Sequence, residues 1–115
     1  MVEKVGKALI IDDEDSIRDG CRQVLSRMGC AVDDTDDAVR GLEMALGGTY
    51  DLILLDVRMP KISGLDILKR LKAESAVSAR IIIITGYGTI EMAVEAMRHR
   101  AFDFLAKPFS SARPS

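Results

Sequence analysis

The chain has 115 residues, a formal net charge of −2 and 48% hydrophobic residues. This length fits one domain with a single hydrophobic core and leaves no room for a second, output-type domain. The weakly acidic balance argues against a nucleic-acid-binding surface, and no apolar run approaches the roughly 20 residues of a membrane span.

The two cysteines, Cys21 and Cys30, do not have the spacing of a metal-binding motif. The first residues contain no apolar segment of the kind found in signal peptides, so we expect a cytoplasmic protein with reduced thiols. Composition divides the chain into a domain over residues 1–109 and a Ser/Arg/Pro-containing tail over residues 110–115, which we expect to be irregular.

The first half of the chain alternates apolar runs with helical patterns. A predicted strand over residues 7–11 ends on acidic residues, and apolar residues at helical spacing from Ile17 to Met28 then predict an amphipathic helix. A second strand begins at Cys30 and becomes polar quickly, as an edge strand does. A second helix is predicted over residues 38–46, before two glycines.

The chain is organised around the apolar run 52–55, which stops on Asp56 and is closed by Met59 and Pro60. Such a run fits a strand that is buried on both faces of a parallel sheet, and proline cannot donate to a strand ladder. Asp56 then lies at the C-terminal end of the strand, where open α/β sheets bind their ligands.

The second half repeats this alternation. We expect a short third helix around residues 65–71, a β-branched fourth strand over residues 80–86, a fourth helix over residues 90–97 and a fifth strand over residues 101–105. Alternating strands and helices predict an α/β fold, a doubly wound five-stranded parallel sheet with the flavodoxin-like order 2-1-3-4-5.

Polar residues follow four of the predicted strands at the edge where the strands end: Asp12, Asp13, Asp56, Thr85 and Lys107. Crowded carboxylates repel unless a cation binds, and an oxygen-rich site suits Mg²⁺ better than zinc. A carboxylate, a divalent ion, a hydroxyl and a lysine together predict a phosphoryl-transfer site with the carboxylate as nucleophile.

Each of these residues also has a purely structural interpretation. Asp12 and Asp13 could favour a helix N-terminus, Thr85 could cap a loop and Lys107 could extend along the surface. Their convergence on one edge favours the chemical interpretation. The single histidine, His99, lies in a basic stretch of the fourth helix, and we expect it to be a solvated surface residue.

The chain resembles the receiver domain of two-component response regulators. The motifs that carry the resemblance are Asp12-Asp13, Asp56 with Met59-Pro60 and Gly64, Thr85-Gly86, and Lys107-Pro108-Phe109. It covers essentially the whole chain up to Phe109. The run over residues 85–97 is further similar to the receivers of enhancer-binding transcription activators.

The resemblance implies that Asp56 accepts a phosphoryl group from a sensor histidine kinase and that the domain then switches conformation to control an output. It also implies a Mg²⁺ site formed by Asp13, Asp56 and the backbone carbonyl of Arg58, with Asp12 acting through water. Such a chain is not an enzyme in the usual sense, because it transfers phosphate only to its own Asp56.

The family pattern assigns the remaining site residues. Thr85 and Lys107 are expected to bind the phosphoryl oxygens, and Phe104 is expected to change rotamer as Thr85 moves. The Lys107–Pro108 bond is expected to be cis.

Two positions depart from the family pattern. Ser63 stands where an aspartate often precedes Gly64, and we expect little effect. Only six residues follow Phe109, where the family has a fifth helix of roughly a dozen residues. A truncated fifth helix would leave the face beside the first helix open, which predicts self-association through that face, for example as a homodimer.

Three other functions compete with this one. A phosphatase of the haloacid-dehalogenase type needs a second aspartate at the position of Arg58, and a nucleotide-binding module needs a phosphate-binding loop where Asp12 to Asp15 stand. A degenerate or truncated receiver that acts as a phosphorylation-independent interaction module remains the alternative.

Overall fold

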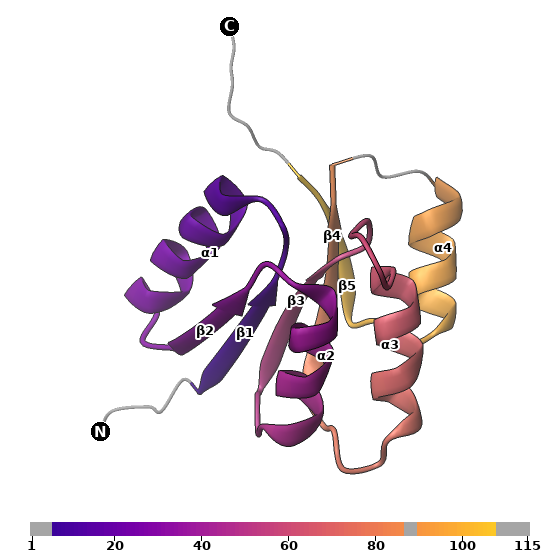
Figure 1. Ribbon diagram of the computed structural model, residues 1–115, viewed down its shortest axis with the longest axis horizontal. Helices are drawn as coiled ribbons and strands as arrows, with labels where there is room; N and C mark the ends of the chain where they lie inside the picture. Colours follow the sequence, from indigo (N-terminus) through magenta and orange to yellow (C-terminus); the bar gives the residue numbers. More distant parts are fainter. Residues whose placement is uncertain (1–5, 87–89, 108–115) are drawn as a thin grey trace, which may run out of the picture.

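The computed structural model describes residues 6–86 and 90–107, which form five strands and four helices in strict alternation (Figure 1). The elements are β1 (Lys7–Ile11), α1 (Asp15–Arg27), β2 (Ala31–Thr35), α2 (Ala38–Gly47), β3 (Leu52–Asp56), α3 (Gly64–Ala73), β4 (Arg80–Thr85), α4 (Ile90–Arg98) and β5 (Asp103–Ala106). None of these helices is long and apolar enough to cross a membrane.

All strands are parallel, and the sheet order is β2-β1-β3-β4-β5. The predicted α/β class and strand order are therefore confirmed. β1 and β3 lie inside the sheet, where Leu9 pairs in register with Ile53, and neither side chain is exposed to solvent. These two buried strands thus place their C-terminal residues side by side.

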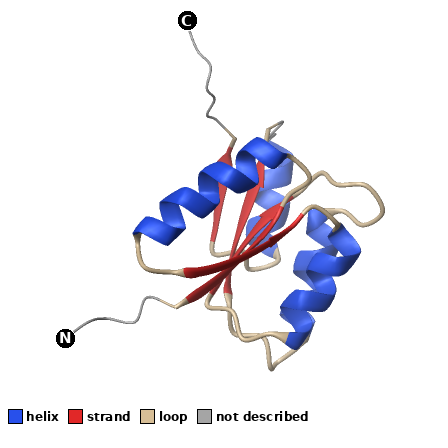
Figure 2. Cartoon of the chain, turned by 60° about the vertical axis from the view of Figure 1, so that its left-hand side comes forward, coloured by secondary structure: helices blue, strands red, loops and turns tan. Residues whose placement is uncertain are grey.

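Helices cover both faces of the sheet. The larger core cluster joins the sheet to α2, α3 and α4, and it includes Leu42, Leu68 and Ala96. On the opposite face the described residues place α1 alone, where Leu25 and Cys21 pack on Ala8, Ile10 and Leu54 (Figures 1 and 2).

The N-terminus of α3 packs tightly against the end of β3. Gly64 N–H donates to the carbonyl of Val57 over 2.9 Å, and the Ser63 hydroxyl caps the helix by accepting from the N–H of Asp66 over 3.1 Å. Ser63 is thus the N-cap of α3, a position that aspartate and serine both favour. A methyl group on Gly64 would lie 2.2 Å from the carbonyl oxygen of Asp56, so this close approach requires glycine.

One strand boundary differs from the sequence-based prediction. β5 begins at Asp103, although the N–H of Phe102 already donates to the carbonyl of Ile81 on β4 over 2.7 Å; the ring of Phe102 lies over the guanidinium of Arg80. In the described residues the face beside α1 is open, as expected, with Val24 55% and Met28 58% exposed. The predicted fifth-helix truncation, the tail and the cis Lys107–Pro108 bond lie outside the described residues.

Candidate functional site

The side chains predicted to form the site gather at the edge of the sheet where the strands end, which we call the carboxyl edge. Asp12 follows β1 and is fully buried, Asp56 ends β3 and is 3% exposed, and Thr85 ends β4 and is fully buried. Lys107 follows β5, and its N–H donates to the carbonyl of Thr85 over 2.7 Å. Parallel pairing therefore brings together residues that are far apart in sequence, as predicted.

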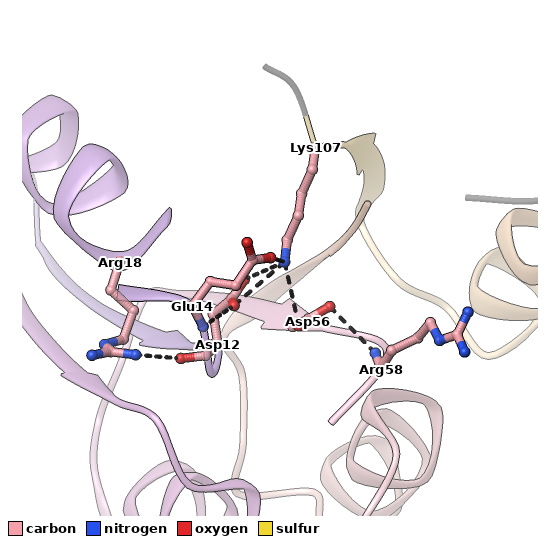
Figure 3. Close-up of polar contacts among 6 residues, drawn as sticks. All are labelled: Asp12, Glu14, Arg18, Asp56, Arg58 and Lys107. Carbon is pink, nitrogen blue, oxygen red and sulfur yellow. Dashed lines mark hydrogen bonds and ion pairs between the residues drawn. The ribbon is translucent and has the colours of Figure 1, made fainter. Parts of the chain in front are cut away.

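Lys107 connects the strands by its ammonium group (Figure 3). Its Nζ lies 3.2 Å from Oδ2 of Asp12 and 3.4 Å from Oδ2 of Asp56. It also forms an ion pair with Oε1 of Glu14. Glu14 is not among the site residues predicted from sequence, because nothing in the sequence distinguishes it from the three acidic residues beside it.

Backbone groups hold the two buried carboxylates in place. The N–H of Glu14 donates to Oδ1 of Asp12 over 2.8 Å, and the N–H of Arg58 donates to Oδ1 of Asp56 over 3.3 Å. Arg18 on α1 donates through Nη1 to the carbonyl of Asp12 over 2.8 Å (Figure 3). Lys107 donates to the other oxygen of Asp56, Oδ2, over 3.4 Å, whereas on Asp12 it donates to the same Oδ1 over 3.4 Å.

Burial and mutual repulsion shift the proton affinities of the site. Burial, followed by the charge of Asp12, raises the pKa of Asp56 to about 6, although the N–H of Arg58 and Lys107 lower it. Burial also raises the pKa of Asp12. Burial lowers the pKa of Lys107, but its contacts with Glu14, Asp12 and Asp56 outweigh this and raise it overall, so the lysine stays charged.

A cation fits among these carboxylates. One oxygen from each of Asp12, Asp13 and Asp56 lies within 4.8 Å of the others, and Asp13 is exposed. Within the part of the chain that the structure describes, Oδ2 of Asp12 is buried without a hydrogen bond, because Lys107 at 3.2 Å is not oriented to donate to it. An oxygen-only set with an unsatisfied buried carboxylate suits a hard divalent cation.

The other predicted residues lie as follows. Phe104 is partly buried on β5 and packs against the larger core cluster. The side chain of Arg58 points away from the carboxylates, and only its backbone faces Asp56 (Figure 3). His99 follows α4, away from the carboxyl edge; it is half-buried rather than freely solvated, because its Nε2 lies 3.1 Å from Oε2 of Glu95.

Comparison with known families agrees with this geometry. Residues 8–113 match the family described as the response regulator receiver domain. The transcriptional regulatory protein FixJ of Bradyrhizobium diazoefficiens is 40% identical over 108 residues, which cover 94% of this chain and 52% of FixJ. The C4-dicarboxylate transport transcriptional regulatory protein DctD of Pseudomonas aeruginosa is 41% identical over 106 residues, which cover 91% of this chain and 22% of DctD.

A solved structure shows the same fold with a modified aspartate. It is the crystal structure of a response regulator protein from Burkholderia pseudomallei with a phosphorylated aspartic acid, a calcium ion and citrate. Its TM-score is 0.81 at 31% identity, and the match covers 90% of this chain and 61% of that one.

The fold, the acidic site and these matches define the class of protein: a phosphorylation-responsive signalling domain of two-component systems. The chain belongs to the response regulator receiver domain family. It is a receiver domain rather than an ordinary enzyme, which sets aside the phosphatase and nucleotide-module interpretations. DctD, among the relatives, bears out the predicted likeness to enhancer-binding regulators. The chain spans about half the length of FixJ.

Proposed function

We propose that Asp56 accepts a phosphoryl group from the phosphohistidine of a sensor histidine kinase. Family membership implies a kinase of that class as partner. The observation that carries the proposal is the position of Lys107, whose Nζ lies 3.4 Å from Oδ2 of Asp56 at a site with two further aspartates. A cationic donor beside a nucleophilic carboxylate is what phosphoryl transfer needs.

In the proposed reaction an oxygen of Asp56 attacks the phosphorus atom. The new O–P bond forms as the P–N bond to the donor imidazole breaks, and its electron pair stays on the nitrogen of the leaving imidazole. Asp56 must react as the ionised carboxylate. Burial raises its pKa and so opposes ionisation, whereas the backbone N–H of Arg58 and the ammonium of Lys107 lower the pKa and favour ionisation. Lys107 is placed to neutralise charge on the transferred oxygens.

We propose Mg²⁺ as the cation of the site, held by Asp13 and Asp56 directly, by the carbonyl of Arg58, and by Asp12 through water. The support is the cluster of carboxylate oxygens and the absence of nitrogen or sulfur ligands in it. When bound, Mg²⁺ would offset the mutual repulsion of the carboxylates and the charge of the incoming phosphoryl group.

We propose Thr85 and Phe104 as the switch. Thr85 is fully buried at the end of β4, and its backbone is tied to Lys107, so it is placed to follow a change at the phosphorylated site. Phe104 packs against the core on β5. The proposed output is control of transcription, and the proposed location is the cytoplasm, where kinases meet ATP.

Intact-mass measurement with phosphoramidate and Mg²⁺ tests the phospho-acceptor. The wild type should gain the mass of one phosphoryl group, and Asp56→Asn should gain none. Asp19→Asn, which changes an exposed acid on α1, is the matched control and should behave as the wild type. Equal uptake by Asp56→Asn and the wild type would refute the assignment.

Self-association remains a proposal for the face beside α1. Val24, Met28 and Leu105 are about half exposed there, and Leu105 shares its sheet face with Ile84, its partner in register on β4. Exposed apolar area of this kind favours association. Sedimentation over a wide concentration range tests it, and a folded monomer throughout would refute it.

A receiver that acts only as an interaction module would associate equally well when Asp56 is replaced by Asn.

A further inference from the structure

Glu14 gives Lys107 a third carboxylate partner. Asp12 and Asp56 are buried beneath the lysine, whereas the side chain of Glu14 is 54% exposed and reaches it from the solvent side (Figure 3). The side chain of Lys107 is itself only 10% exposed. A lysine ammonium has three donors, so three carboxylates can occupy it completely.

The backbone of Glu14 is fixed, but its carboxylate is not. The N–H donates to Asp12 over 2.8 Å, and the carbonyl accepts from the N–H of Arg18 over 3.1 Å at the start of α1. Glu14 is the N-cap residue of that helix, yet its side chain makes no capping hydrogen bond. Among the described residues, only the contact with Lys107 holds the carboxylate, so rotation of the side chain into solvent should leave the fold unchanged.

We propose that Glu14 is a positioning residue: its carboxylate forms an ion pair with Lys107 before phosphorylation, and this ion pair breaks when Lys107 binds the phosphoryl oxygens. The proposal rests on the proposed phosphoryl transfer to Asp56. A phosphoryl group on Asp56 places new anionic oxygens next to Nζ. The three N–H donors of Lys107 cannot bind these oxygens and also keep the ion pair with Glu14. Glu14 therefore competes with the phosphoryl group for the same ammonium, and its charge repels an incoming anionic donor.

The expected consequence is that Glu14 restrains the phosphorylated state. Glu14→Gln should bind beryllium fluoride about two- to fivefold more tightly than the wild type at saturating Mg²⁺, the range set by weak, exposed ion pairs. Phosphorylation by phosphoramidate should be faster by a similar factor. Glu14→Asp, which keeps the charge but shortens the reach, should fall between the two.

Asp36→Asn is the matched control for charge. Asp36 is an exposed acid that follows β2 at the same carboxyl edge, and it is not among the carboxylates that Lys107 contacts. Removal of one negative charge at a distance should change the affinity less than Glu14→Gln does. Unchanged thermal melting of all variants would separate the effect on binding from an effect on folding.

Isothermal titration of beryllium fluoride into the full chain decides between the outcomes. Tighter binding by Glu14→Gln than by Asp36→Asn supports the competition. Equal binding by the two variants overturns the proposed competition. Weaker binding by Glu14→Gln also overturns it, because it would mean that Glu14 helps Lys107 to bind beryllium fluoride. Failure of the wild type to bind at all would instead overturn the proposed role of Asp56.

Discussion

Asp12 and Asp56 end neighbouring parallel strands, and the charge of Asp12 adds to burial in raising the pKa of Asp56 to about 6. Because this value lies above the ordinary 3.8, folding favours the protonated form of Asp56. The stabilising contribution is complete below about pH 4 and is lost as the pH rises through about 6. At neutral pH, without a divalent cation, the ionised group therefore destabilises the fold.

Asp56→Asn should accordingly raise the free energy of unfolding at pH 7.5 in the presence of a chelator, by about 2–3 kcal/mol. At pH 4 the difference from the wild type should shrink, because both forms are then neutral at this position. Urea unfolding at the two pH values measures it, with Asp19→Asn as the surface control. A stabilisation that does not depend on pH would contradict the electrostatic origin.

Mg²⁺, the proposed cation, should stabilise the wild type at pH 7.5, because an ion bound at the folded site would relieve the repulsion between Asp12 and Asp56. At a concentration 100 times the dissociation constant, the gain is about 2.7 kcal/mol. Thermal melting with increasing Mg²⁺ measures the gain, and a chelator should reverse it. Asp13→Asn should reduce the response, whereas Asp51→Asn, at the opposite end of β3, should retain it.

Thr85→Ala should separate chemistry from switching. In the proposed switch Thr85 meets a phosphoryl oxygen only after transfer, so phosphorylation should remain largely intact while the conformational response weakens by a population shift of a few kcal/mol. Backbone amide spectra with and without beryllium fluoride measure the response, and Thr85→Ser keeps the hydroxyl as a control. Loss of phosphorylation with normal switching would reverse the assigned role.

The strands and the buried part of the site could be predicted from sequence because both depend on local patterns. The apolar run before Asp56 indicated a buried strand, and parallel topology then required Asp12, Thr85 and Lys107 to share one edge. Each of these residues lies at or just after the end of a strand. A polar residue at the end of an apolar run is visible without coordinates.

The features that sequence did not predict depend on contacts between elements. Glu14 is one of four consecutive acids, and only the placement of Lys107 distinguishes it from the others. The cap formed by Ser63 is a local bond with the N–H of Asp66, three residues on, and a serine before a helical pattern is a sequence signal that could have indicated it.

Gly64 and Gly20 are both helical glycines, yet alanine should have opposite effects at the two positions. A Cβ on Gly64 would lie 2.2 Å from the carbonyl oxygen of Asp56 and 2.6 Å from Cα of Val57, both backbone atoms that cannot move aside independently. Gly64→Ala should therefore push α3 away from β3 and destabilise the fold by about 1–3 kcal/mol. The shift also moves the backbone of Asp56, so Mg²⁺ affinity should fall.

Gly20→Ala is the matched control. Gly20 is exposed in the middle of α1, and an added Cβ there meets nothing within 4 Å. Alanine should stabilise the fold at this position by about 0.5–1 kcal/mol, because glycine loses more backbone entropy in a helix. Urea unfolding of both variants, with and without Mg²⁺, measures the two effects. One result would contradict this prediction: Gly64→Ala is as stable as Gly20→Ala and responds to Mg²⁺ as the wild type does. The close packing of α3 on β3 would then not be what positions Asp56.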